Sequence, residues 1–294
     1  MTQWDFDLQQ YLKSHFEMKD LGNLSYFLGL EVNSTSDGYY LSQAKYVSDL
    51  LSRSVITDTD IASTPLDTNA KLTPSDGTLL SDPTLYRQLV GSLVYLTVSR
   101  PDIAYAVHVV SQFMSGPRTA HFTAVLRILR YVKCTLFHGL HFSDNSPLVL
   151  SGYSDADWAG DPTDRCSTTG YCFFLGNSLI SWRSKKQTVT SRSSTESEYR
   201  ALADATSELL WLRWLLEDMG VQHDSATILH CDNQSAIQIA HNDVFMREQN
   251  ILRMIVTSSA SIWFGALFSF PLFPPPIRRL ISLLKLIFQV VFMP

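Results

Sequence analysis

The chain has 294 residues, of which 45% are hydrophobic, so it can bury a sizeable core and is not disordered as a whole. Its formal net charge of −5 argues against binding nucleic acid through the overall field and leaves only local basic patches for that role. The four cysteines have no spacing typical of a metal site or a disulfide framework. No apolar leader follows Met1, so the sequence predicts an intracellular protein, cytoplasmic or nuclear, without a targeting signal.

Apolar periodicity in the first half of the chain predicts a small α+β region. We expect a short helix over residues 5–20, strands over 24–32 and 38–42, and a helix over 43–52. Residues 57–82 are rich in Asp, Thr, Ser and Pro, which predicts a linker or an extended crossing segment. Further helices are expected over residues 83–98, from Arg100-Pro101-Asp102 onward, and over 121–132.

The second half shows a different order of elements. Three consecutive antiparallel strands are expected, then a long amphipathic helix, a fourth strand and a short helix. Their ranges are 148–153, 170–175, 178–183, 194–219, 226–231 and 233–240. Trp211 and Trp214 stand at helical spacing on the long helix, where we expect them to contact the core or the preceding region. The order β-β-β-α-β-α indicates a mixed α/β fold.

Three carboxylates occupy special places in this pattern. Asp155 and Asp232 stand at the ends of apolar strand-like runs, and Glu198 lies at the head of the long helix. Carboxylates that arrive from two strands and a helix can converge on hard divalent cations. The sequence therefore predicts a metal site built from these three residues.

Five ordered words give these acids a family context. Residues 150–245 resemble the ribonuclease H domain of copia-type retrotransposon polyproteins. The words that carry the resemblance are GYSDADWAG at 152–160, STTGY at 167–171, SWRSKKQ at 181–187, STESEY at 194–199 and CDNQSA at 231–236. The resemblance spans about a hundred residues, so it covers most of the predicted β-β-β-α-β-α region.

The first 145 residues resemble the C-terminal part of the reverse transcriptase in the same polyproteins. The words that carry this are FEMKDLG at 16–22, YFLGLEV at 26–32, LSQ at 41–43, YRQLVGSL at 86–93 and RPDI at 100–103. By resemblance this is the thumb and connection region. The polymerase palm, with its Tyr-Val-Asp-Asp word, would lie upstream of Met1, so we expect no DNA synthesis from this chain.

The resemblance implies three regions and a chemistry. It implies a reverse transcriptase thumb and connection region at 1–145, a truncated ribonuclease H-like α/β domain at 146–245, and an apolar tail at 246–294. Ribonuclease H cleaves the RNA strand of an RNA–DNA hybrid with Mg²⁺, and Mn²⁺ can serve as well. By position in the motifs, Asp155, Glu198 and Asp232 would be both the catalytic residues and the metal ligands.

Neighbouring residues need separate interpretations. Asp157 shares a strand face with Asp155, but the strand is turning there, so we do not expect it to bind metal. Glu196 points elsewhere on the helix, and the segment 194–196 is expected to cap that helix. Cys231 is expected to serve strand packing.

Four basic residues flank the site in sequence. Arg183, Lys185, Lys186 and Arg192 could contact the phosphates of a hybrid, which would compensate the acidic overall charge. The alternative is a solvated hairpin and loop, and the sequence favours neither.

The chain leaves the family pattern at Met246. The family continues with His-Glu-Arg-Thr-Lys-His-Ile, an acidic pair and His-Phe, whereas the chain reads MREQNILRMIVTS. Synonymous codons can be chosen for this stretch such that another reading frame translates as the family ending. We therefore infer a frame change near residue 246. The fourth metal carboxylate and the last helix are then missing. The tail is too short and too interrupted by Pro and Lys to span a membrane, so we expect no membrane partner.

Two main functions remain open on this sequence, beside a third possibility, a membrane-associated protein that uses residues 264–293 of the tail. The first is a retrotransposon-derived ribonuclease H domain that is inactive or weakly active, with an RNA–DNA hybrid and other polyprotein parts as partners. The alternative is a non-enzymatic nucleic-acid-binding remnant or a pseudogene product of such a polyprotein.

Overall fold

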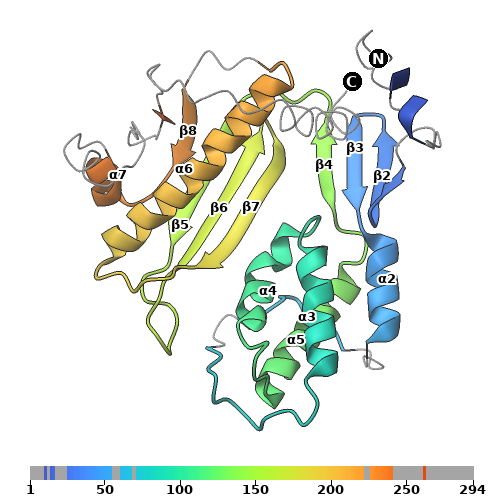
Figure 1. Cartoon of the computed structure of the whole chain (residues 1–294), viewed down its shortest axis with the longest axis vertical. Coiled ribbons are helices and arrows are strands. Elements are labelled where there is room, and N and C mark those ends of the chain that lie inside the picture. The colour runs from blue at the N-terminus through green and yellow to red at the C-terminus, as the bar shows by residue number, and fades with distance from the viewer. Residues whose placement is uncertain are drawn as a thin grey trace.

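The computed structural model describes residues 10–11, 14–16, 25–54, 60–67, 71–221, 226–240 and 261–262. It is a mixed α/β structure with two β-sheets, each accompanied by helices (Figure 1). The helix expected over residues 5–20 falls largely outside the described residues, and so does nearly all of the tail at 246–294.

The first sheet is antiparallel throughout. Its strands, in spatial order, are β1 (Tyr26–Phe27), β2 (Leu30–Thr35), β3 (Gly38–Ser42) and β4 (Leu140–Ser143). The single strand expected over 24–32 is wrong, because the chain turns at Leu28 and Gly29 with φ of 47° and 77° and folds β1 back on β2. β4 was not expected, since its partner β3 lies far away in sequence.

Helices pack below the first sheet and enclose an apolar core (Figure 1). They are α2 (Ala44–Arg53), α3 (Thr84–Leu96), the 3₁₀ turn η1 (Pro101–Ile103), α4 (Ala104–Ser111) and α5 (Thr119–Cys134). The predicted helices are confirmed within a few residues. In the described parts of the predicted linker, the backbone forms no regular element beyond an isolated bridge between Leu79 and Arg118.

The second sheet contains the elements that carry the three acids. Its spatial order is β7-β6-β5-β8-β9, with β5 parallel to β8 and the other neighbours antiparallel. The strands are β5 (Leu150–Ala156), β6 (Thr168–Leu175), β7 (Ser178–Lys186), β8 (Thr227–His230) and β9 (Ser261–Ile262). The predicted meander of three antiparallel strands is confirmed, and β7 extends to Lys186.

The long helix α6 (Ser194–Asp218) crosses one face of this sheet, and α7 (Gln234–Ala240) follows β8 (Figure 1). Leu202, Leu209 and Leu216 are buried with Phe173 of β6 in one apolar cluster, so α6 is fixed by packing along its length. The expectation that the tryptophan pair contacts the core is wrong: the exposed fractions of Trp211 and Trp214 are 50% and 52%. They occupy the outer face of an amphipathic helix.

β7, at the edge of the second sheet, contacts α4 and β4 of the first part of the chain. The indole N–H of Trp182 donates to the carbonyl of Thr97 at 3.1 Å, and the backbone N–H of Lys186 donates to Nε2 of His108 at 3.0 Å. The two sheets are thus joined through β7. The proposed boundary at 145/146 falls between β4 and β5, and it stays a prediction.

No helix within the described ranges combines the length and the apolar character that crossing a membrane requires.

Candidate acidic site

Two strands bring Asp155 and Asp232 to the same end of the second sheet. In the parallel pairing of β5 with β8, Tyr153 lies opposite His230. Asp155 and Asp232 each come two residues later, and both are exposed. Because β5 and β8 run parallel, the residues that follow the paired positions lie at the same end of the sheet, and the charges of both carboxylates act on Glu198. The parallel register therefore places these two carboxylates at neighbouring positions.

Glu198 reaches the same place from α6. The helix begins after Ser193, whose side-chain oxygen accepts the backbone N–H of Glu196 at 3.2 Å. Glu198 then lies one turn into the helix with an exposed fraction of only 5%. Its carboxylate accepts a hydrogen bond from the backbone of Ala156 and contacts Asp155. Asp155 and Glu198 therefore meet where β5 ends and α6 begins.

The electrostatics of Glu198 reflect this crowding. Burial raises the pKa of its carboxyl to about 7, the Ala156 hydrogen bond opposes this, and the charges of Asp155 and Asp232 raise it further. Like charges that face one another at a buried carboxyl are the arrangement that a cation would relieve. The charges of Asp155 and Asp232 thus both act on Glu198 in this structure.

Cys231 also belongs to this group, which sequence reasoning missed. The ligand atoms of Glu198, Cys231 and Asp232 all lie within 4.8 Å of one another. Burial first, and then the neighbouring acids, raise the pKa of the Cys231 thiol to about 11. A thiol directly before a predicted metal ligand was the available signal. The sequence predicts strand packing for Cys231, but β8 ends at His230, so Cys231 lies beyond the strand.

Asp157 and Glu196 have local partners. The Asp157 carboxylate accepts the backbone N–H of Thr168 and so closes the loop between β5 and β6. Glu196 accepts the backbone N–H of Arg192 at 2.9 Å and pairs with the guanidinium of Arg200, also at 2.9 Å. Glu196 therefore belongs to the helix cap as expected, with Ser193 rather than Ser194 as the N-cap residue.

The four basic residues have different surroundings. Lys186 forms ion pairs with Asp161 at 2.6 Å and Asp164 at 2.8 Å, and only 20% of its side chain is exposed. Arg183, Lys185 and Arg192 are exposed. Arg183 also makes a hydrogen-bonding contact with Tyr171 on the neighbouring strand β6. A role in phosphate contact stays a prediction for all four residues.

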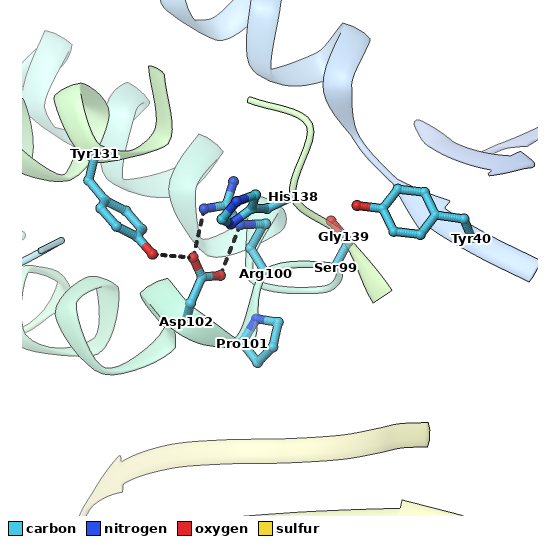
Figure 2. Close-up of a pocket in the computed structure, with 8 residues that line it drawn as sticks. All are labelled: Tyr40, Ser99, Arg100, Pro101, Asp102, Tyr131, His138 and Gly139. Atoms are coloured by element: carbon cyan, nitrogen blue, oxygen red, sulfur yellow. Dashed lines mark hydrogen bonds and ion pairs between the residues drawn. The ribbon is translucent and has the colours of Figure 1, made fainter. Parts of the chain in front are cut away.

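A separate hollow of about 310 Å³ lies in the first part of the chain, away from these acids (Figure 2). Arg100, which is 1% exposed, donates to both carboxylate oxygens of Asp102 and to the carbonyl of Thr135. Tyr131 donates to the same carboxylate. Burial alone would raise the pKa of Asp102, but the hydrogen bonds and charge of Arg100 hold it below its usual range. Arg100 and Asp102 neutralise each other, and their hydrogen bonds to Tyr131 and Thr135 connect η1 to the end of α5.

Comparison with known proteins places this amino-acid sequence in a family. Residues 4–68 match the family model described as reverse transcriptase (RNA-dependent DNA polymerase). The Pol polyprotein from transposon RE2 of Arabidopsis thaliana is 45% identical over 234 residues, which is 80% of this chain and 16% of the relative. The corresponding polyprotein from transposon TNT 1-94 of Nicotiana tabacum is 39% identical over 245 residues, 80% of this chain and 18% of the relative.

The chain belongs to the copia-type retrotransposon Pol polyprotein family. It spans about 16% of the length of the RE2 polyprotein. A shorter family relative, an uncharacterized mitochondrial protein of Arabidopsis thaliana, is 49% identical over 201 residues, 68% of this chain and 83% of the relative. No solved structure was found to match this Pol polyprotein segment.

Proposed function

We propose that the acidic site derives from a Mg²⁺-dependent ribonuclease H that cleaves RNA in RNA–DNA hybrids, and that its turnover in this chain is weak or absent. The observation that carries the proposal is the meeting of Asp155, Glu198 and Asp232 at one end of the second sheet. Membership of the copia-type Pol family supports a nucleic-acid substrate.

The sheet topology supports a ribonuclease H-like fold for this region, which we propose on the same grounds. An antiparallel meander β5-β6-β7 is followed by the crossover helix α6 and by β8 parallel to β5. This agrees with the β-β-β-α-β order that the apolar pattern of the sequence predicts. The crossover puts Glu198 of α6 beside two strand ends, and that arrangement is the one the chemistry needs.

The side chains present fit a hard divalent cation. Carboxylate oxygens are the ligands that Mg²⁺ and Mn²⁺ prefer, and here burial and then the charges of Asp155 and Asp232 raise the pKa of the Glu198 carboxyl. Asp155, Glu198 and Asp232 would hold the metal. Such ions supply an activated water and stabilise a leaving oxygen. The chain's own residues orient the ligands: the Ala156 N–H holds the Glu198 carboxylate, and the α6 cap holds the helix.

Weak turnover follows from the sequence at Met246. The family word that would bring a fourth acidic residue is absent there, and the chain continues instead with an unrelated apolar tail. Three carboxylates give less negative charge for metal binding than four. We therefore propose lowered metal affinity and a lowered rate in this chain.

Cleavage of a labelled RNA–DNA hybrid with Mg²⁺ or Mn²⁺ tests the proposal. We expect at most trace cleavage, lost in Asp155→Asn. A matched chain in which the sequence from Met246 is replaced by the alternative-frame translation should cleave at least about tenfold faster. Robust turnover in the unmodified chain would overturn the predicted weakness. Cleavage that survives Asp155→Asn would show that this site is not the catalyst.

A non-enzymatic remnant that binds nucleic acid is the second candidate. The exposed cations Arg183, Lys185 and Arg192 favour it, since they can contact phosphates without any metal. Binding of a hybrid that depends on salt, persists in Asp155→Asn and falls in Lys185→Ala would support this function. Binding that is lost in Asp155→Asn with Mg²⁺ present would favour the enzyme-derived site instead.

A further inference from the structure

Gln187, the first residue after β7, uses its side-chain amide to join three segments. Its Nε2 donates to Oγ1 of Thr169 at 3.1 Å and to the backbone carbonyl of Ser197 at 2.9 Å. Its Oε1 accepts the hydroxyl hydrogen of Ser191 at 3.2 Å. The backbone N–H of Gln187 donates to the carbonyl of Ser167 at 2.8 Å. Both amide hydrogens are therefore used, one on a strand and one on a helix.

The two acceptors lie beside the residues that orient Glu198. Ser197 directly precedes Glu198 in the first turn of α6. Thr169 pairs with Ala156 across the β5–β6 ladder, and the backbone of Ala156 hydrogen-bonds the Glu198 carboxylate. Gln187 thus bridges the helix turn that carries Glu198 and the strand pair against which the Glu198 carboxylate is held.

The partners of Gln187 leave little freedom. Thr169, Ser191 and Ser197 have exposed fractions of 2%, 3% and 0%. A buried polar group that loses its partner is costly, so these contacts are kept together in the folded chain. The indole N–H of Trp158 donates to the Ser191 carbonyl at 3.1 Å, which adds the segment that follows Asp155.

We propose that Gln187 is a positioning residue of the acidic site, which sets the Glu198 carboxylate against Asp155 and so determines metal affinity. This inference rests on the proposed function. Removal of a group that hydrogen-bonds and orients a metal ligand commonly lowers metal affinity by about tenfold or more, because a misplaced ligand binds less well. The side-chain hydrogen bonds of Gln187 go to Thr169, Ser191 and Ser197, so it acts through the first turn of α6.

The test measures Mn²⁺ binding to the full chain by electron paramagnetic resonance, with Gln187→Met as the main variant. Methionine has a similar length and volume but cannot donate to Thr169 and Ser197. We expect the dissociation constant for Mn²⁺ to rise about tenfold. Gln238→Met is the matched control, because Gln238 is exposed on α7, and it should bind Mn²⁺ like the unmodified chain.

Two further variants separate positioning from mere stability. Leu216→Ala removes a buried side chain at the far end of α6 and should lower the melting temperature without changing Mn²⁺ affinity. Thr169→Val removes one acceptor of Gln187 with little change of shape and should weaken Mn²⁺ binding by a few-fold. This second variant decides the question if Gln187→Met does not fold.

The outcomes distinguish the inference from the function on which it rests. If Asp155→Asn abolishes Mn²⁺ binding while Gln187→Met and Thr169→Val bind normally, Gln187 has no positioning role and the metal site stands. If Asp155→Asn leaves Mn²⁺ affinity unchanged, the acidic site is not a metal site and both proposals fail. Equal weakening in Leu216→Ala and Gln187→Met would also overturn the positioning role, because it would trace to stability alone.

Discussion

The Sγ of Cys231 lies 3.9 Å from Oε2 of Glu198, so a thiol from the end of β8 contacts a carboxyl group from the first turn of α6. Burial and the surrounding acids keep that thiol protonated, with a pKa of about 11. The S–H group can therefore donate weakly toward Glu198, and it competes poorly with carboxylates for hard cations. The uncharged Cys231 thiol therefore lines one side of the acidic site.

Glu198 should make stability depend on pH. Its pKa of about 7 in the folded chain lies above the ordinary value of 4.5, so the folded state binds the proton more tightly than the unfolded chain. The resulting stabilisation is complete below the ordinary pKa and is lost as the pH rises through about 7. In metal-free buffer we expect the free energy of unfolding to fall by on the order of 2 kcal/mol between about pH 5 and pH 8, measured by urea denaturation.

Glu198→Gln is the control for this dependence, since it removes the titrating group and keeps the shape. Its stability should change much less over the same pH range. Added Mg²⁺ should also reduce the fall in the unmodified chain, because a cation favours the ionised carboxylate. An identical fall in Glu198→Gln would show that other groups cause it.

Lys186 and Lys185 should differ despite their adjacency. Lys186→Met breaks the largely buried ion pair with Asp161 and the half-exposed one with Asp164, so we expect a loss of about 1 kcal/mol in the free energy of unfolding. Lys185→Met, at an exposed position, should change stability by less than about 0.5 kcal/mol. If Lys185 contacts hybrid phosphates, Lys185→Met should reduce the slope of log binding constant against log salt concentration by about one. A larger stability loss in Lys185→Met would contradict this assignment.

His108 should make the joint between the two sheets sensitive to acid. Its Nε2 accepts the Lys186 backbone N–H, which requires a neutral ring, and burial followed by the charge of Lys186 lowers its pKa below 6.5. The unfolded chain takes up the proton near 6.5, so this contribution to stability is present above that pH and lost below it. Hydrogen exchange of the Lys186 amide, corrected for its intrinsic rate, should accelerate between about pH 7 and pH 5. The acceleration should disappear in His108→Phe, whose Lys186 amide is unprotected at both pH values.

Gly152 should tolerate no side chain. A Cβ at this β5 position would overlap the ring of Phe173, a fully buried residue on the neighbouring strand. Overpacking of this kind costs about 1–3 kcal/mol, so Gly152→Ala should unfold at a clearly lower urea concentration. Gly170→Ala is the matched control on β6, where an added Cβ meets nothing within 4 Å. Comparable destabilisation by both changes would mean that backbone freedom, rather than the Phe173 ring, explains Gly152.

Local patterns were sufficient for most elements of the second sheet. Alternating apolar residues predicted β5, β6 and β7, and the capping residues with their leucine spacing predicted α6 to within a residue at either end. Contacts between segments far apart in sequence could not be predicted from local patterns. β4 pairs with β3 across most of the first half of the chain, and a positive φ at Leu28 divides what reads as one strand. Leu28 gives no sequence signal for that conformation, and the available signal was Gly29 beside it, which also has a positive φ.

In the candidate site, too, some residues were predictable from local sequence and others depend on tertiary packing. Asp155, Glu198 and Asp232 were predicted from their places at element ends and from the family words, and in the structure the charges of both aspartates act on Glu198. The parts played by Cys231 and Gln187 depend on how β8 ends and on how α6 docks, which are matters of tertiary packing. Spacing in one sequence carries no information about either.

The parallel pairing of β5 with β8 also separates the two strands in the order of synthesis. Parallel neighbours need a long crossover, and here it is α6, which carries Glu198 on the way. During synthesis Asp155 leaves the ribosome well before Asp232, so the meander of β5, β6 and β7 can form while its acidic residue still lacks a counterpart. A nascent or prematurely ended chain that stops before β8 keeps three strands and the helix, but it holds only two of the three carboxylates.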